Sequence, residues 1–238
     1  MSTPPRIDRK ELKTPDQFVT RGRALLEKLF QQRSRFLPVL ILGGTVVALV
    51  YAYEWWNSSR RENQWTAYQE IQKAPEAERW DKLKTFHQEH SSGRPALFAA
   101  VALADHYFDE AKKEALKDPG NVPSAVPSEQ WYAKALLESS LLSGEKQLLH
   151  VNRGSALEMQ KKWDEAQKEF QTAVDLQGEA KGLAMLSLAR VYEAKNETEK
   201  AVQTYEKISA DFMNSEYAKL AKSSVRRLKS PLFKTPNS

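Results

Sequence analysis

The stretch KKWDEAQKEFQTAV, residues 161–174, recurs in altered form as NETEKAVQTYEKI at residues 196–208. Upstream of each copy, VNRGSALEM at 151–159 and LSLARVYEA at 186–194 align at the same period of 35 residues. Small and aromatic or large aliphatic residues coincide in these alignments, namely Ala166 with Ala201, Phe170 with Tyr205, Gly154 with Ala189 and Leu157 with Tyr192. A small residue in each of two helices lets their backbones approach closely, and the larger residue fills the space toward the next pair. The spacing therefore predicts stacked pairs of antiparallel helices.

The rest of the chain extends this all-α prediction. Ala, Leu, Glu, Lys and Gln are abundant, and apolar residues recur at helical spacing in one segment after another. Glycine and proline mark the breaks between segments. We expect helices at 61–73, 76–90, 95–116, 128–143, 145–160, 162–177, 179–195, 197–210 and 214–229, the last as an amphipathic cap.

An earlier copy of the repeat is expected upstream of the first two. Its first helix would carry Leu103, Ala104 and Tyr107, and its second helix Ala133 and Leu137. The insertion KDPGNVPSAVPS at 117–128 separates them, either as a dispensable exposed loop or as a binding element.

A period near 34 residues with this pattern resembles the tetratricopeptide repeat family. Arg153 departs from it, because the family prefers a large apolar residue there, and the proline that closes each repeat is absent. Such repeats form an open solenoid with a groove lined by the first helix of each pair. The candidate protein-binding residues of that groove are Tyr107, Asn152, Arg153, Arg190 and Glu193.

The segment FLPVLILGGTVVALVYAY at 36–53 carries no charge. As a helix it would span roughly 27 Å, close to the thickness of the bilayer interior. We therefore predict a transmembrane helix at 36–56, with a cleaved signal peptide as the alternative. Residues 1–35 hold nine basic and four acidic side chains, which places the N-terminus in the cytoplasm. The expected localisation is a bacterial inner membrane, with a helical repeat domain at 57–229 in the periplasm and a disordered tail at 230–238.

Two groups of residues have expected roles in this span. Aromatic side chains at its outer end would anchor it in the headgroup layer, namely Tyr51, Tyr53, Trp55 and Trp56. Small residues at every fourth position would allow another membrane helix to approach, namely Gly44, Ala48 and Ala52. Residues 16–32 read either as an interfacial helix or as an extension of the span.

Composition argues against several function classes. The chain has no cysteine, which excludes thiolate catalysis. Its net charge of +5 resides in residues 1–35, so the large domain has no basic excess that would indicate nucleic-acid binding. No phosphate-binding glycine loop, nucleophile elbow or metal-ligand cluster is recognisable. We expect no enzyme activity, cofactor, metal or small-molecule substrate.

The stretch VYAYEWWNSSRRENQWTAYQEI at 50–71 resembles the corresponding region of the YfgM-type ancillary subunits of the bacterial Sec translocon. The resemblance implies a non-enzymatic adaptor beside the translocon, with translocon subunits, periplasmic chaperones or emerging polypeptides as partners. Two alternatives remain open. One is a scaffold for envelope assembly or cell division, which the segment at 210–228 favours. The other is a transmembrane regulator that acts through its cytoplasmic tail.

Overall fold

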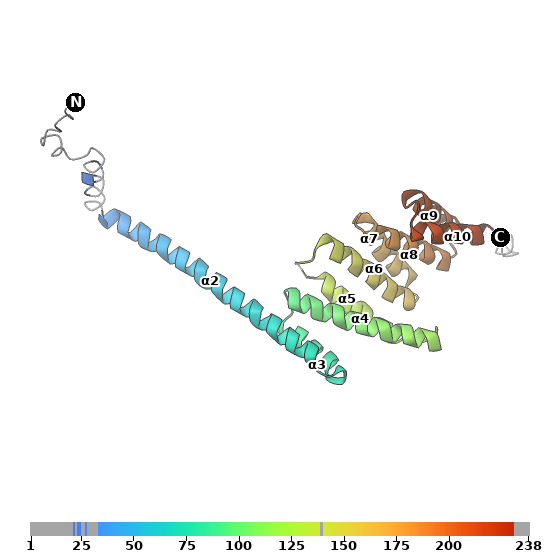
Figure 1. Ribbon diagram of the computed structural model, residues 1–238, viewed down its shortest axis with the longest axis horizontal. Coiled ribbons are helices and arrows are strands. Elements are labelled where there is room, and N and C mark those ends of the chain that lie inside the picture. The colour runs from blue at the N-terminus through green and yellow to red at the C-terminus, as the bar shows by residue number, and fades with distance from the viewer. Residues whose placement is uncertain (1–20, 22, 25–26, 28–32, 139, 231–238) are drawn as a thin grey trace, which may run out of the picture. The chain divides into compact units, whose positions relative to one another are not determined.

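The computed structural model describes residues 21, 23–24, 27, 33–138 and 140–230 (Figure 1). Within those residues every regular element is an α-helix. The chain divides into two compact units, one ending at Arg61 and the other beginning at Glu62. The helices are α2 (Arg33–Lys73), α3 (Glu76–Glu89), α4 (Arg94–Lys117), α5 (Ala125–Leu136), α6 (Ser143–Met159), α7 (Trp163–Asp175), α8 (Lys181–Ala194), α9 (Thr198–Asp211) and α10 (Glu216–Lys229).

Helix α2 corrects the prediction of a membrane span at 36–56. The apolar segment is not an element of its own but part of one 41-residue helix, which continues through charged residues to Lys73. The large apolar side chains described from Val39 to Trp56 are exposed, and the side chains of residues 33–37 and 40 lie outside the described set. Among the described residues, no helix has both the length and the apolar character needed to cross a bilayer.

The predicted transmembrane helix is therefore wrong, and so is the single-pass inner-membrane localisation with a periplasmic domain. The translocon, envelope and transmembrane-regulator hypotheses were all built on that span, and nothing in the described residues supports them. Most of the predicted basic tail at 1–35, and all of the predicted tail at 230–238 except Ser230, lie outside the described residues.

The second unit is a stack of helix pairs. From α3 to α10, each helix packs on the next one in sequence, and α4, α6, α8 and α10 also pack on one another in succession (Figure 1). In the described part of the chain, α5, α7 and α9 have no such contacts with one another. The even-numbered helices thus form an inner layer and the odd-numbered helices an outer layer, as in an α-solenoid.

The close approach inferred from the repeat is visible between α6 and α7. Gly154 faces the fully buried ring of Phe170, and a Cβ placed on Gly154 would lie 2.7 Å from its Cε1 atom. The turn after α6 recurs after α8, where Lys161 and Asn196 adopt left-handed backbone angles 35 residues apart. In each turn a backbone N–H returns to a carbonyl five residues earlier, from Lys162 to Leu157 and from Glu197 to Tyr192.

The first copy of the repeat is present, but its second helix has a different register from the one predicted. Ser128, Tyr132 and Ala135 are among its buried residues, whereas Leu137 is 84% exposed. These three have the spacing of Ala166, Phe170 and Ala173 in α7. The buried hydroxyl of Ser128 donates to the carbonyl of Ala104, 3.0 Å away, and so joins α5 to α4. The prediction failed because α5 begins at Ala125, so the insertion comprises only residues 118–124.

Candidate protein-binding groove

The inner layer carries a row of three cavities, which we call the groove. The largest, about 450 Å³, lies between α4, α6, the start of α7 and α8, and we call it the loop-walled cavity. The second, about 190 Å³, lies between the first halves of α4 and α6. The third, about 300 Å³, lies between α6, α8 and α10. All three draw side chains from consecutive inner helices, so one elongated ligand could contact several repeats.

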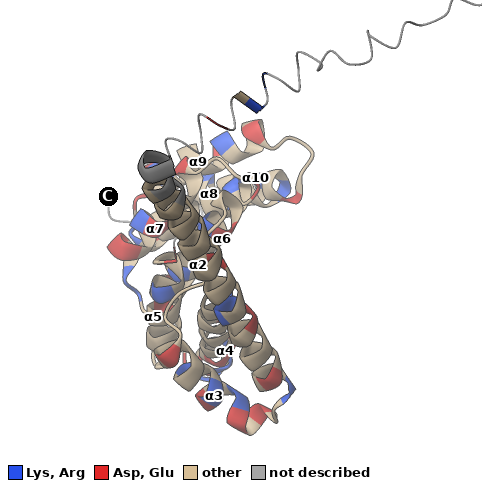
Figure 2. Cartoon of the chain, turned by 90° about the vertical axis from the view of Figure 1, so that its left-hand side faces the viewer, with Lys and Arg blue, Asp and Glu red and all other residues tan. Residues whose placement is uncertain are grey.

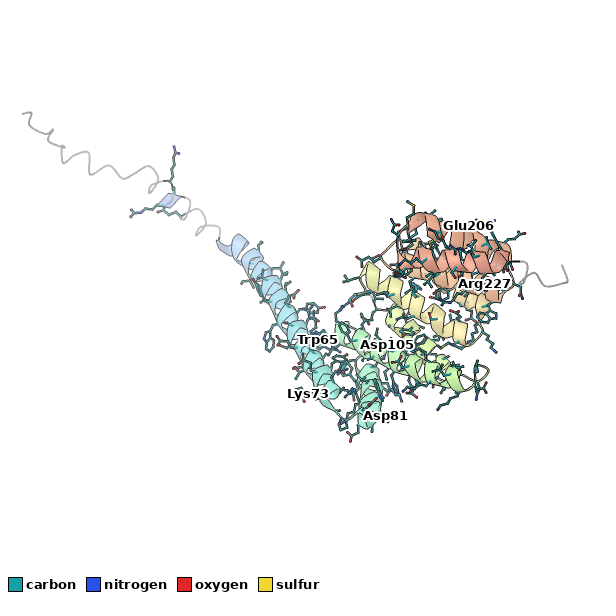
Figure 3. All side chains as sticks on the ribbon, turned by 45° about the vertical axis from the view of Figure 1, so that its right-hand side comes forward. Trp65, Lys73, Asp81, Asp105, Glu206 and Arg227 are labelled. Atoms are coloured by element: carbon teal, nitrogen blue, oxygen red, sulfur yellow. The ribbon has the colours of Figure 1, made fainter. Side chains whose placement is uncertain are left out.

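Apolar side chains line the second and third cavities. Phe98 and Leu148 are 37% and 49% exposed there, and Leu183 and Tyr217 continue the lining onto α8 and α10. Trp65 lies beside this row, with its ring centroid 5.7 Å from that of Phe98 (Figure 3). Exposed large apolar residues in a row are unusual on a surface that has no partner.

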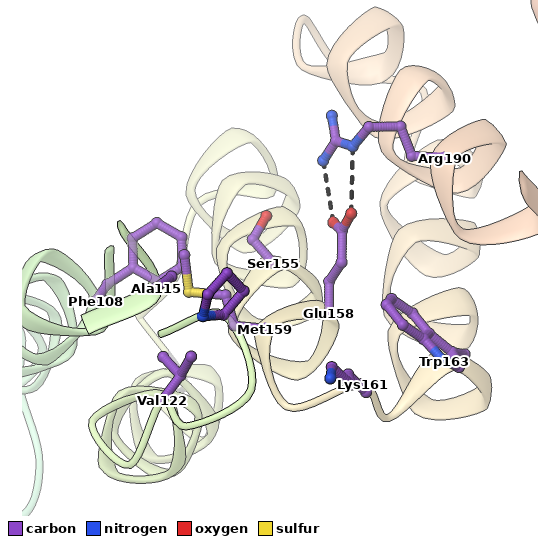
Figure 4. Close-up of a pocket in the computed structure, with 10 residues that line it drawn as sticks. Phe108, Ala115, Val122, Ser155, Glu158, Met159, Lys161, Trp163 and Arg190 are labelled. Carbon is purple, nitrogen blue, oxygen red and sulfur yellow. Dashed lines mark hydrogen bonds and ion pairs between the residues drawn. The ribbon is translucent and has the colours of Figure 1, made fainter. Parts of the chain in front are cut away.

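The loop-walled cavity combines apolar and charged side chains (Figure 4). Phe108, Val122 and Met159 lie on one side, and Trp163 lies on the other. Between them the Arg190 guanidinium donates two hydrogen bonds to the Glu158 carboxylate, at 3.0 and 3.3 Å. The remaining lining residues are Ala115, Pro119, Ser155 and Lys161.

Of the five residues predicted for the groove, two line its cavities. Asn152 contributes to the second cavity and Arg190 to the loop-walled cavity. Tyr107 instead lies against α3, with the Lys84 ammonium 5.7 Å above its ring. Glu193 accepts a hydrogen bond from the Tyr205 hydroxyl at 2.7 Å and pairs with Arg227 at 2.6 Å, so it joins α8 to α9 and α10.

Arg153 occupies the repeat position at which its charge was unexpected. Its guanidinium pairs with Glu129 at 2.6 Å and with Glu169 at 2.8 Å, and so ties α6 to both outer helices beside it. Glu169 also contacts the Nδ1 atom of His150 at 2.7 Å. The two carboxylates are only 14% and 15% exposed. Because burial penalises unpaired charge, this network explains why a cation replaces an apolar residue here.

Tyrosines in the outer helices make similar connections. The Tyr132 hydroxyl donates to Asp105 at 2.5 Å, as the Tyr205 hydroxyl does to Glu193. Burial, followed by the adjacent carboxylate, raises the pKa of both phenols, so both remain neutral donors. These side chains fix the helix pairs, and they offer no nucleophile or acid–base pair to a ligand.

One more ion pair lies at the start of the inner helices α4 and α6. Arg94 donates two hydrogen bonds of 2.7 Å to Glu145 across the start of α4 and α6. Together with a backbone N–H at Leu142, this arrangement lowers the pKa of Glu145 to about 2. Elsewhere, acidic and basic side chains are interspersed over α3 to α10 (Figure 2). Among the described residues, no group of three or more His, Asp or Glu could hold a metal ion.

The apolar row was not predicted from the sequence, although a signal for it exists. Phe98 and Leu148 lie on inner helices, but they do not occupy the repeat positions that form the core. Once the repeat is aligned, both side chains are therefore expected to be exposed. The residues with predicted membrane roles all lie in α2, where a Cβ placed on Gly44 would meet no atom within 4 Å apart from its chain neighbours and the backbone of its own helix. The roles of Ala48, Ala52 and the four aromatic residues also rested on the span and are not carried further.

Comparison with known proteins agrees with this architecture. Residues 145–211, from α6 to α9, match the tetratricopeptide repeat family. A point variant of the nearly identical TPR-like repeats of a Podosopora anserina protein, assigned as a kinesin light chain, has a TM-score of 0.50. It is 14% identical, and the match covers 72% of this chain and 84% of that one. A second structure of those repeats has a TM-score of 0.46 at 16% identity, with the same coverage. No curated protein matches the chain in sequence.

The prediction of an all-α stack of tetratricopeptide-like helix pairs is therefore confirmed. At these identities the structural likeness concerns the fold alone. Tetratricopeptide repeat proteins are typically non-enzymatic scaffolds that bind other proteins, and no catalytic family is indicated. The resemblance to YfgM-type subunits finds no support in these comparisons.

Proposed function

We propose that this protein is a non-enzymatic adaptor whose groove binds a segment of another protein, either an unfolded polypeptide or a chaperone. The observation that carries the proposal is the row of exposed and half-buried apolar side chains on consecutive inner helices. Phe98, Leu148, Leu183 and Tyr217 supply one anchor each from α4, α6, α8 and α10. A segment with apolar residues at regular spacing could bury them against this row.

Physical features of the groove favour such a ligand. Helix pairs in a solenoid hold their inner surface in a fixed shape, which reduces the entropy lost when a ligand binds. Amphipathic or extended segments are the usual occupants of apolar grooves of this kind. Asn152 can bond to main-chain groups of the ligand, because its amide has both donor and acceptor atoms.

The test uses the purified full chain and a permanently unfolded polypeptide, reduced and carboxymethylated lactalbumin, labelled for fluorescence anisotropy. Leu148→Asp places a charge in the middle of the apolar row, and we expect it to weaken binding at least tenfold. Leu137→Asp is the control, because Leu137 follows α5 in the outer layer and is even more open to solvent, at 84% exposure compared with 49% for Leu148.

Thermal unfolding should show that both variants remain folded. Equal affinities of the two variants for the probe would contradict the proposal, because the inner layer would then have no special role.

A further inference from the structure

The loop-walled cavity owes its shape to a feature that the other repeats lack. Helix α4 has 24 residues, compared with 17 in α6 and 14 in α8. Its final turns supply Ala115, and the loop at 118–124 that follows supplies Pro119 and Val122. The insertion, which the sequence left open as either dispensable or a binding element, thus forms one wall of the largest cavity in the groove.

Hydrogen bonds hold this wall in place. The Glu114 carboxylate accepts hydrogen bonds from the backbone N–H and the hydroxyl of Ser124, at 2.9 and 2.7 Å. Within the loop, Asp118 accepts a bond from the Gly120 N–H at 2.8 Å. A wall fixed before binding does not have to be ordered by the ligand, so the cavity is prepared for an occupant.

The interior of the cavity suits a large apolar side chain. Phe108, Met159 and Trp163 are half-buried around it, and its volume of about 450 Å³ falls within the usual range of ligand pockets. Methionine is flexible and polarizable, so Met159 can adapt to rings of different shape.

The charges at the cavity indicate which kind of residue should stand next to the apolar side chain in the ligand. Glu158 and Arg190 neutralise each other through their two hydrogen bonds. Lys161 is exposed at the rim, and within the described residues its ammonium has no ion pair or side-chain hydrogen bond. The lining therefore carries one uncompensated positive charge, which an acidic group would complement.

We propose that the loop-walled cavity binds one aromatic or large apolar side chain of the partner segment, and that an acidic residue beside it pairs with Lys161. This inference rests on the proposed function, because its ligand is part of the segment bound in the groove. It adds a sequence preference that the apolar row alone does not supply.

The probes are fluorescein-labelled nonapeptides of Gly and Ser with three different centres. One carries Trp between two Asp, one carries Trp between two Lys, and one carries Ala between two Asp. With the full chain in fluorescence anisotropy, we expect the first to bind about 3- to 10-fold more tightly than the second, as for exposed ion pairs. Replacing the central Trp by Ala should weaken binding at least tenfold.

Variants of the chain then locate the site. Lys161→Glu should reverse the preference between the Asp and Lys peptides. Lys162→Glu makes the same change of charge at the next residue, which does not line the cavity, and should keep the original preference. Val122→Trp and Met159→Trp fill the cavity from the loop and from α6, and each should abolish the advantage of the Trp peptides. Circular dichroism of each variant checks that the helices are retained.

The outcomes separate this inference from the proposed function. Reversal by Lys161→Glu together with loss in either filled variant supports the inference. If the peptides lose affinity in Leu148→Asp but keep it in both filled variants, the groove binds at the apolar row, so the adaptor function stands and this inference fails. If neither the peptides nor the unfolded polypeptide binds to the wild-type chain, both fail.

Discussion

The contact between Gly154 and Phe170 gives the sharpest test of the repeat architecture. In Gly154→Ala the new methyl group would lie 2.7 to 3.0 Å from three atoms of the Phe170 ring, which is fully buried and has no space to withdraw. Overpacking in a core costs about 1–3 kcal/mol, and contacts of 3.0 Å or less with a fully buried ring place this change in the upper part of that range, at about 2–3 kcal/mol. The better helix propensity of alanine returns about 1 kcal/mol. We therefore expect a net loss of roughly 1–2 kcal/mol of unfolding free energy, or a melting temperature lower by roughly 2–8 °C for a chain of this size.

Urea and thermal denaturation followed by circular dichroism would measure this loss. Gly144→Ala is the matched control, because it makes the same change in the same helix where nothing lies within 4 Å of the new atom. It should leave stability unchanged or raise it by up to about 1 kcal/mol. In the double variant Gly154→Ala with Phe170→Leu, the combined loss should be smaller than the sum of the two single losses.

A Gly154→Ala protein as stable as the wild type would refute the reasoning. It would mean that α6 can move away from α7 without cost. The next pair, α8 and α9, already has alanine at the position of Gly154, where Ala189 is the counterpart and Tyr205 corresponds to Phe170.

Three further outcomes are expected. Arg153→Met removes the cation shared by two largely buried carboxylates and leaves Glu169 with only its His150 contact, so it should cost about 2–3 kcal/mol in urea denaturation, whereas loss of a merely solvated arginine would cost almost nothing. Ser128→Ala removes the hydrogen bond to the Ala104 carbonyl and should cost about 1 kcal/mol in the same assay, with unchanged stability as the contrary result. Arg94 holds the pKa of Glu145 at about 2, below its ordinary value of 4.5, so the stabilisation is complete above pH 4.5 and is lost as the pH falls toward 2. Wild type should therefore exceed Glu145→Gln by roughly 1 kcal/mol at neutral pH, and an acid titration that leaves this difference constant would contradict the assignment.

The repeat could be predicted where its period is undisturbed. In α6 to α9 the positions of small and aromatic residues are local properties of the sequence. The structure buries Ala166 and Phe170 in one hydrophobic cluster and Ala201 and Tyr205 in the next, as expected. Upstream, the insertion breaks the period, and spacing alone then left the register of α5 undetermined. The buried spacing of Ser128, Tyr132 and Ala135 would have revealed it, but only by comparison with the later copies.

Of the residues predicted for the groove, only Asn152 and Arg190 line cavities of the inner layer. Helical periodicity shows which face of a helix is polar. It does not show which side chain of a neighbouring helix each polar residue on that face contacts. Arg153 and Glu193 are therefore committed to contacts between helices, whereas Arg190 lies at a cavity. The wall made by residues 118–124 depends on the Glu114 contact across the loop, which no pattern along the chain indicates.

The sequence by itself determined that this protein is a stack of helix pairs. Close packing of two helices requires small residues at fixed intervals, and such residues recur along the chain at a period of 35 residues. The tertiary structure decided which side chains remain free on the inner helices, because a side chain's partner can come from any helix packed against it. It also decided that the apolar segment at 36–53 is part of one long helix, since the end of a helix depends on all the residues that follow and not on where hydrophobicity stops.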